Sequence, residues 1–416
     1  MQDMASWDWE TGEKAVADIG EIRSRYQEVR EFAVSDDGEK LAVIVRGDEG
    51  VTPCVNGEPW DSSFEKAWGL RFLSTGNLVA LVMKDDEWTV GVDGETWEEK
   101  FDFAWNPRFT PDGTGIVVQV KSGMDYTLAV NGKAWEKKFA SIRDFAISPN
   151  GQTVIAAVQL EPLKEGDTAK FLEGLWGVAV DDQLVDGKFL NVWGPRATDG
   201  GRTAAEVRTG IMEFSVMQNG TVWPDRYGMV WEPCLAPSGS VLVPVKLPGG
   251  WTLARDGKTD WPGRYAQLFR LRLSPDGSRV AGVAAPSFGN WTVVVDDVPW
   301  PTMWTDAVLD PVFSSDGRRV SAAVRSNGQW SVAVDGAAWN ATFDMVWDPV
   351  FSPGGDRLAV RVEKDGALAL AIDGRSSPLH YEMLWNPVFS PDGRKLLIRA
   401  VENGKYVRSV VSVDAF

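Results

Sequence analysis

The chain has 416 residues, of which 21 are Trp and 42 are Gly, but it has only one His and two Cys. Its 59 acidic and 42 basic residues give a net charge of −17, which argues against a surface for nucleic acid or anionic lipid. So few His and Cys residues exclude a Cys-rich iron–sulfur site, a c-type haem attachment and a closed zinc site of the Cys/His type.

The N-terminal segment, residues 1–30, precedes the first full repeat of the chain. Residues 7–29 resemble the second half of a repeat unit, whereas the last unit supplies three strands and stops at Phe416. We therefore predict that an N-terminal strand completes the last unit. The rest of the chain, residues 31–416, is predicted to consist of tandem repeats.

A turn motif recurs along these repeats. WNPRFTPDG at 105–113 returns as WDPVFSPGG at 347–355 and as WNPVFSPDG at 385–393. Eight of the nine intervals between successive turn glycines are 37 to 40 residues, and the ninth, from Gly151 to Gly201, is 50. The turn glycines are Gly38, Gly76, Gly113, Gly151, Gly201, Gly239, Gly277, Gly317, Gly355 and Gly393. This spacing indicates a repeat architecture.

Each unit reads as four short strands, as residues 309–346 illustrate. A first strand is followed by the Ser-Ser-Asp-Gly turn, a second strand at 319–324 and a third at 330–334. Asp335-Gly336 then predicts a tight hairpin, because a type I′ turn needs positive φ at both central residues. Second strands such as 78–82 are almost wholly apolar, which indicates that both faces of each sheet are covered.

These features predict an all-β fold, a β-propeller of about ten four-stranded units of ~38 residues. The ends of the chain favour one ring closed by the N-terminal strand. Two five-bladed propellers are the alternative, since four to eight blades are typical of a single ring.

The Trp residues follow the same register. Seven follow the hairpin turn, six open a unit and five begin a third strand, and only Trp7, Trp9 and Trp304 lie outside these positions. The seven after the hairpin are Trp60, Trp97, Trp135, Trp223, Trp261, Trp300 and Trp339. We interpret the Trp excess as packing between blades, and not as a relay for electrons.

The fourth unit carries an insertion at residues 160–174. Insertions in repeat proteins map to loops, often on a binding face, although a surface loop also tolerates such an insertion at little cost. We predict a contact with a partner protein there. The candidate contact residues are Leu163, Lys164, Lys170, Phe171, Leu172 and Trp304.

No residue stands out as catalytic, cofactor-binding or metal-ligating. His380 is expected to be an ordinary surface residue, and Cys54 and Cys234 align with apolar strand positions and are expected to remain free thiols. The acidic turn residues are Asp37, Asp112, Asp276, Asp316 and Asp392. Their expected role is to bond their own turns, although a carboxylate pair for glycoside hydrolysis or a Ca²⁺ site remains an alternative.

Two resemblances follow from these motifs. The strings LSPDG at 273–277 and FSPDG at 389–393 resemble the WD40-like, TolB-type propeller repeat. The joined pattern of Trp330, Asp335-Gly336, Trp339 and the segment 347–351 is similar to the tryptophan-rich subunit of the Tmc transmembrane electron-transfer complex of sulfate-reducing bacteria.

The second resemblance implies a subunit without cofactors in a membrane redox complex. Its partners would be a multihaem cytochrome c, an integral cytochrome b and an iron–sulfur subunit related to heterodisulfide reductases. The complex would pass electrons between periplasmic cytochrome c and the cytoplasmic side. The sequence contains no stretch of membrane-spanning length, and its acidic N-terminus does not read as a signal peptide. We therefore expect a peripheral protein on the cytoplasmic face of the membrane.

Two classes of function remain. The first is a scaffold or docking propeller in such a complex, and the second is a propeller enzyme of the glycosidase or lactonase type with carboxylates at its axial funnel. The sequence favours the first.

Overall fold

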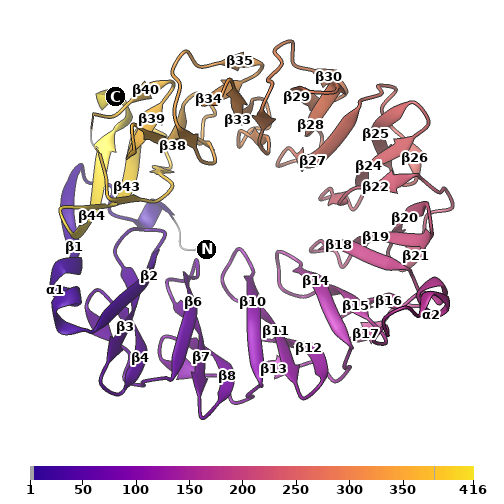
Figure 1. Ribbon diagram of the computed structural model, residues 1–416. Coiled ribbons are helices and arrows are strands. Elements are labelled where there is room, and N and C mark those ends of the chain that lie inside the picture. The colour runs from indigo at the N-terminus through magenta and orange to yellow at the C-terminus, as the bar shows by residue number, and fades with distance from the viewer. Residues whose placement is uncertain (1–3, 379) are drawn as a thin grey trace. The chain divides into compact units, whose positions relative to one another are not determined.

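The computed structural model describes residues 4–378 and 380–416, and it confirms the all-β fold class (Figure 1). The strands form ten blades of a β-propeller, each built on four antiparallel strands. The chain divides into two compact units, which we describe separately. Unit 1 comprises Met1–Trp97, Trp291–Val293 and Trp300–Phe416, and unit 2 comprises Glu98–Asn290 and Val294–Pro299.

Blades are numbered in chain order, and blades 1, 2, 8, 9 and 10 belong to unit 1. Their strands are, in blade 1, β2 (Glu28–Val34), β3 (Leu41–Gly47), β4 (Gly50–Val55) and β5 (Glu58–Pro59); in blade 2, β6 (Lys66–Phe72), β7 (Leu78–Lys84), β8 (Glu87–Val92) and β9 (Glu95–Thr96); in blade 8, β31 (Ala307–Val308), β32 (Val312–Phe313), β33 (Val320–Ser326), β34 (Gln329–Val334) and β35 (Ala337–Ala338); in blade 9, β36 (Met345–Val346), β37 (Val350–Phe351), β38 (Leu358–Lys364), β39 (Ala367–Ile372) and β40 (Arg375–Ser376); and in blade 10, β41 (Met383–Leu384), β42 (Val388–Phe389), β43 (Lys395–Glu402), β44 (Lys405–Ser412) and β1 (Gly12–Asp18). Unit 1 also contains the helix α1 (Ile19–Arg25) and the 3₁₀ turns Met4–Ser6 and Val413–Ala415.

Blades 3 to 7 belong to unit 2, apart from residues 291–293 of blade 7. Their strands are, in blade 3, β10 (Phe103–Phe109), β11 (Ile116–Ser122), β12 (Asp125–Val130) and β13 (Lys133–Ala134); in blade 4, β14 (Ser141–Ile147), β15 (Val154–Gln159), β16 (Trp176–Val180) and β17 (Gln183–Leu184); in blade 5, β18 (Asn191–Ala197), β19 (Thr203–Gly210), β20 (Glu213–Gln218) and β21 (Thr221–Val222); in blade 6, β22 (Met229–Val230), β23 (Cys234–Leu235), β24 (Val241–Leu247), β25 (Gly250–Arg255) and β26 (Lys258–Thr259); and in blade 7, β27 (Gln267–Leu273), β28 (Val280–Ser287), β29 (Asn290–Val295) and β30 (Val298–Pro299). The helix α2 (Thr168–Glu173) lies between β15 and β16.

In blades 6, 8, 9 and 10 the first strand is interrupted. Blade 9 is an example, since β36 and β37 each pair with β38 but are separated by the segment that contains Pro349. Proline has no N–H to donate to the ladder, so it breaks the pairing at that point.

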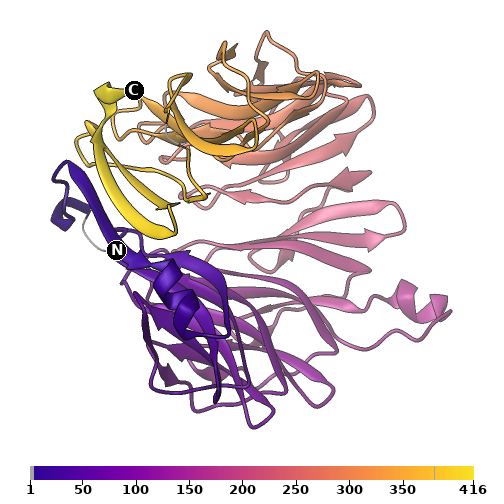
Figure 2. The same ribbon diagram turned by 60° about the vertical axis from the view of Figure 1, so that its left-hand side comes forward.

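The N-terminal strand completes the last blade, as the sequence predicts. β1 pairs antiparallel with β44 from Gly12↔Val410 to Asp18↔Lys405. Figure 2 shows β1 alongside the C-terminal strands. The N-terminal strand thus belongs to blade 10, and blades 1 and 10 lie in the same compact unit, which contradicts the alternative of two successive five-bladed propellers.

Blade 10 is also fixed to the first turn of blade 1. The hydroxyl of Tyr406 donates to the carbonyl of Gly38 at 3.0 Å, and Nε of the buried Arg408 donates to the carbonyl of Asp37 at 2.9 Å. Arg408 lies 3.0 Å from Glu39 as well. The end of the chain is thus held against its beginning by buried polar contacts.

The helix α1 is a feature that the sequence analysis does not predict. Asp18 caps its N-terminus by accepting a hydrogen bond from the backbone N–H of Glu21 at 2.9 Å. Ile19 and Ile22 are buried in the core of unit 1, so this helix covers the strands that close the propeller.

The second strands are buried as predicted, and Trp side chains fill the space between blades. The five residues 78–82 of β7 are fully buried. Trp60 of blade 1 lies against β8 and the following hairpin of blade 2: an added Cβ would be 2.9 Å from Cζ3 of the indole at Gly91 and 3.7 Å from its Cγ at the hairpin residue Gly94. The hairpin glycines of the following blades lie in the same way against Trp223, Trp300 and Trp339. This confirms packing between blades as the role of these Trp residues.

Candidate interaction surface

Large apolar side chains are exposed at the hairpin tips between the second and third strands of unit 2. Met124 in blade 3 is 84% exposed and Phe288 in blade 7 is 84% exposed. Ile211 and Met212 form the tip in blade 5 and are 62% and 71% exposed. Because these hairpins connect the same two strands in each blade, the tips lie at the same end of their sheets.

The corresponding tips in unit 1 are polar. They are Asp48-Glu49, Asp85-Asp86, Asn327-Gly328, Asp365-Gly366 and Asn403-Gly404. Asp and Asn tolerate the positive φ that a tight hairpin requires, and Asp85, Asn327, Asp365 and Asn403 all adopt it. Turn geometry therefore does not demand Met, Ile or Phe at a tip, and their presence in unit 2 needs another reason.

Two further side chains extend this surface. Phe103 begins β10 opposite Lys121, and Met229 begins β22 opposite Lys246, so both lie at the same end of the sheets as the tips. They are 43% and 39% exposed. We call the whole set the apolar edge of unit 2. Its residues are Phe103, Met124, Leu163, Leu172, Ile211, Met212, Met229 and Phe288.

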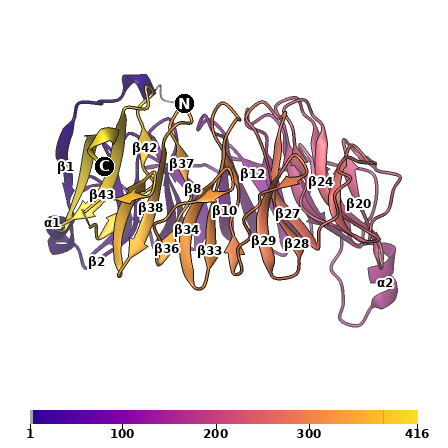
Figure 3. The ribbon, with the colours of Figure 1, turned by 90° about the horizontal axis from the view of Figure 1, so that it is seen from above.

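The insertion of blade 4 occupies the equivalent hairpin position, and it contributes Leu163 and Leu172. It carries α2, which Asp167 caps through the N–H of Lys170 at 3.0 Å. Figure 3 shows α2 projecting beyond the neighbouring strands of unit 2. Lys170 also pairs with Glu161 at 2.7 Å, and this ion pair holds the helix against the start of the insertion.

The structure thus separates the candidate contact residues into groups. Leu163, Lys164 and Leu172 are exposed, while Phe171 and Lys170 are half-buried. Trp304 is only 5% exposed. Its selection as a contact residue is corrected, because a side chain packed inside the blade has no surface to offer.

Trp304 belongs to an aromatic position that the sequence analysis overlooked. Its backbone forms an antiparallel bridge to Trp291, and its ring lies edge-on to Trp300 at 6.2 Å between centroids. Aromatic residues form the same bridge in other blades. They are Phe64, Phe139, Phe189, Tyr227, Tyr265, Phe343 and Tyr381.

The apolar tips were also missed from the sequence. Met124, the pair Ile211-Met212 and Phe288 stand where blades 1, 2, 8, 9 and 10 have Asp, Asn, Glu or Gly. Comparing the repeats at that one hairpin position would have shown the difference.

The acidic turns are explained by local hydrogen bonds, as expected. Oδ1 of Asp112 accepts from the hydroxyl of Thr110 at 2.5 Å and from the N–H of Thr114 at 3.1 Å. These hydrogen bonds lower the pKa of Asp112 to about 2, and equivalent bonds lower that of Asp276 to about 2. Within the described residues, no group of three or more His, Cys, Asp or Glu side chains is placed to hold a metal ion.

The remaining scarce residues do not form a site. His380 is exposed, as predicted. Cys54 is buried, Cys234 is half-buried, and both are free thiols. Burial raises the pKa of Cys54 to about 11, which makes it an unreactive thiol at neutral pH.

An arginine and a buried glutamate lie close together where blades 4 and 5 meet. The guanidinium of Arg143 lies between the indoles of Trp176 and Trp193, 4.1 and 5.0 Å from their centroids. Glu206, opposite Trp193 in blade 5, is 8% exposed. Burial raises the pKa of Glu206 to about 8, although the nearby Arg143 acts to lower it.

No protein-family model matches the chain, and no curated protein matches it. Among solved structures, a eukaryotic initiation factor is similar at 13% identity and a TM-score of 0.46, over 90% of this chain and 96% of that one. The Dos1 propeller is similar at 10% identity and a TM-score of 0.37, over 96% and 94% of the two chains. TolB from Acinetobacter baumannii is similar at 15% identity and a TM-score of 0.31, over 71% and 77%. These likenesses concern the propeller fold. No helix in the described part of the chain is long and apolar enough to cross a membrane.

Proposed function

We propose that this chain is a non-catalytic docking subunit of a membrane-associated redox complex, and that the apolar edge of unit 2 binds a partner subunit. The observation that carries the proposal is the contrast between the two units. Hairpin tips that are uniformly polar in unit 1 are replaced in blades 3, 5 and 7 of unit 2 by apolar side chains up to 84% exposed. Large apolar side chains exposed together on one edge of a folded protein are typical of an interaction site.

The shape of this surface favours a protein partner. Its most exposed residues stand on two-residue hairpins, and α2 projects beyond the neighbouring strands of the same unit. Met and Phe are enriched where protein interfaces are buried, and Met adapts to the shape of the opposing surface. Removing such side chains from water favours association, because burial of apolar surface is the dominant favourable contribution in most protein–protein complexes.

The kind of complex is suggested by the resemblance to the tryptophan-rich Tmc subunit. The partners would then be the multihaem cytochrome c, the cytochrome b and the iron–sulfur subunit of such a complex, with this chain on the cytoplasmic side. In this role the chain holds its partners together while they pass electrons between periplasmic cytochrome c and the cytoplasmic side.

The proposal is tested by purification from the native host. Membranes are solubilised in detergent, the complex is isolated through a tag on this chain, and the haem spectrum and subunit composition are measured. We expect haem-containing partners to co-purify with the natural chain. A variant with Met124→Ser, Leu172→Ser and Phe288→Ser should lose them while remaining folded, since all three side chains are exposed.

A matched control changes the polar tips of unit 1 instead, with Asp85→Asn, Asn327→Asp and Asp365→Asn, which keep residue types that tolerate the positive φ found there. This control should retain its partners. Recovery of the chain alone, without a haem protein, would refute the redox-complex assignment. Loss of partners from the control but not from the apolar variant would refute the apolar edge as the docking surface. Binding of the isolated chain to protein-free lipid vesicles through the same residues would show that the edge meets lipid instead.

A further inference from the structure

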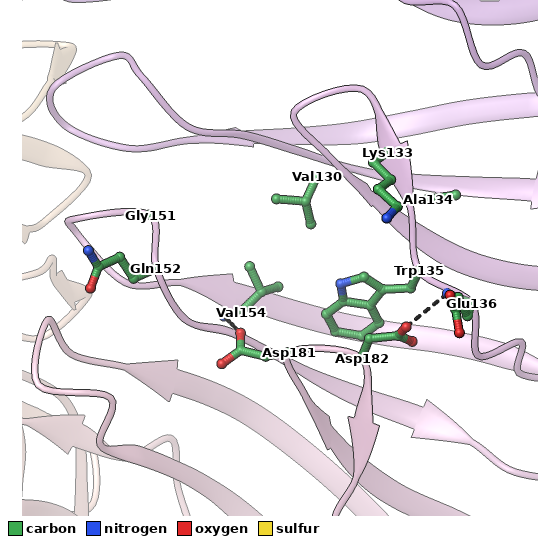
Figure 4. Close-up of a pocket in the computed structure, with 10 residues that line it drawn as sticks. All are labelled: Val130, Lys133, Ala134, Trp135, Glu136, Gly151, Gln152, Val154, Asp181 and Asp182. Carbon is green, nitrogen blue, oxygen red and sulfur yellow. Dashed lines mark hydrogen bonds between the residues drawn. The ribbon is translucent and has the colours of Figure 1, made fainter.

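Hydrogen bonds between side chains and backbone groups hold neighbouring blades of unit 2 together. The carboxylate of Asp182 in blade 4 accepts a hydrogen bond from the backbone N–H of Glu136 in blade 3 at 2.9 Å (Figure 4). It also accepts one from the N–H of Lys137 at 3.0 Å. Asp297 in blade 7 accepts in the same way from Gly263 in blade 6, at 2.9 Å. These contacts involve the hairpins between the third and fourth strands, and a second series of contacts starts from the second strands.

The fourth residue of the second strand makes this second kind of contact in two blades. In blade 3 it is Gln119, whose Nε2 donates to the backbone carbonyl of Ile142 in blade 4 at 3.0 Å. In blade 9 it is Arg361, whose Nη1 donates to the backbone carbonyl of Leu384 in blade 10 at 2.5 Å. Ile142 and Leu384 both lie five residues before the end of the first strand of their own blades. A carbonyl at this position therefore accepts a hydrogen bond from a side chain of the preceding blade.

Glu206 and Val230 occupy the same two positions in blades 5 and 6. Glu206 is the fourth residue of β19, and Val230 lies five residues before the end of β23. Both residues are buried, and Glu206 is only 8% exposed. By register, Glu206 stands to Val230 as Gln119 stands to Ile142. An ionised carboxylate has no hydrogen to donate, whereas a protonated carboxyl donates through its O–H much as the amide of Gln119 does through its N–H.

The surroundings of Glu206 favour the protonated form. In blade 3 the amide of Asn106 donates to Oε1 of Gln119 at 2.9 Å. The corresponding residue in blade 5 is Gly194, which follows Trp193 and has no side chain to donate. Burial raises the pKa of Glu206 to about 8, and no hydrogen bond from a described residue acts to lower it.

Arg143 of blade 4 is the one described charged group that acts on this carboxyl, and it acts to lower the pKa. The strands that adjoin Glu206 carry other charged residues, and β22 (Met229–Val230) carries none. Those other residues are Arg196 on β18, Arg208 on β19, Glu213 on β20 and Lys246 on β24. Arg196 is paired with Glu232, and Arg208 donates to its own hairpin. Burial therefore outweighs the attraction of Arg143.

We infer that protonated Glu206 donates a hydrogen bond to the backbone carbonyl of Val230, and that loss of this proton releases β22 from blade 5. Because the pKa of Glu206 is about 8, the bond is present at neutral pH and is lost as the pH rises above this value. The released strand has two residues and pairs with β24. Its Met229 belongs to the apolar edge, but the inference concerns the contact between two blades and does not depend on the proposed docking function.

The protonation state is tested by infrared spectroscopy of the full chain, in which a protonated carboxyl has a band distinct from that of a carboxylate. We expect such a band at about pH 6 and its loss by about pH 9.5. The band should be absent from Glu206→Gln at both pH values. This variant should fold, because Gln119 occupies the equivalent position in blade 3.

Release of the strand is tested by hydrogen exchange of the Met229 and Val230 amides, corrected for the intrinsic effect of pH. In the natural chain we expect exchange about fivefold faster at about pH 9.5 than at about pH 6, as for the loss of one hydrogen bond. In Glu206→Gln the amide donates at every pH, so exchange should stay slow at both. The amide of Ile142 is the internal reference, because its strand is held by Gln119, which does not titrate.

Two further variants complete the test. Glu213→Gln changes an exposed glutamate of the same blade and should keep the pH-dependent exchange of the natural chain. Glu206→Leu has no donor, so β22 should exchange fast at both pH values; if it does not fold, Glu206→Gln still decides the question. The inference would be overturned if no protonated-carboxyl band depended on Glu206, if the release of β22 at high pH persisted in Glu206→Gln, or if Ile142 showed the same effect of pH.

Discussion

Replacing Glu206 by Gln should remove a pH dependence from the stability of unit 2. The carboxyl is buried and its pKa is raised from 4.5 to about 8. Between these two pH values the folded chain keeps the proton and the unfolded chain has lost it, so unfolding releases a proton and stability falls as the pH rises. At ~1.4 kcal/mol per pH unit this interval corresponds to a loss of about 5 kcal/mol.

The variant should fold, because Gln119 naturally occupies the equivalent position opposite Trp105 in blade 3. Hydrogen exchange of the β19 and β20 amides, corrected for the intrinsic effect of pH, measures the local free energy of opening between pH 5 and 9. We expect that free energy to decrease with pH in the natural chain and to decrease much less in Glu206→Gln. Parallel curves for the two proteins would refute the reasoning, as would a direct carboxyl titration of Glu206 near 4.5.

Three further predictions concern the blade architecture and are checked by urea unfolding. Gly91→Ala should cost about 1–3 kcal/mol, because its Cβ would lie 2.9 Å from the indole of Trp60, whereas Gly47→Ala meets nothing within 4 Å and should be nearly neutral. Equal losses in the two variants would exclude this packing argument. Tyr406→Phe should cost about 1–2 kcal/mol, since a buried carbonyl loses its donor; an unchanged midpoint would show that this contact does not help to close the propeller. The carboxyl of Asp276 has its pKa lowered from 3.8 to about 2, so the stability it confers is complete above pH 3.8 and is lost as the pH falls toward 2. Asp276→Asn should lack that part of the acid sensitivity, and an identical acid profile would contradict the prediction.

The sequence predicted the fold well because the blade signals are local. Asp335 and Gly336 fix a hairpin through their own positive φ, and the apolar run at 78–82 shows that a strand is covered on both faces. The helix α1 was not predicted, because its seven residues carry only one turn of apolar spacing and follow a strand directly. Its buried residues Ile19 and Ile22 gain their stability from neighbours that are distant in the sequence.

The candidate surface was predicted only in part. The insertion at residues 160–174 was visible as an extra length, and Leu163 and Leu172 are exposed as expected. Trp304 was misassigned, because it lies outside the three common Trp positions of the repeat. Only its antiparallel bridge to Trp291 shows that it fills the aromatic position found in the other blades. The apolar tips of blades 3, 5 and 7 were not recognised, because each tip is short and lies far from the others in the sequence. Their shared position at one end of the sheets is evident only in the structure.

The sequence by itself determined the period, the four strands of each blade and the Trp positions, since all of these depend on turn geometry and on alternation within about 38 residues. Only the tertiary structure decided that β1 pairs with β44 and that Glu206 is buried. These features depend on contacts between residues that are far apart in the sequence. A repeat pattern specifies each blade and leaves open which side chains of neighbouring blades meet.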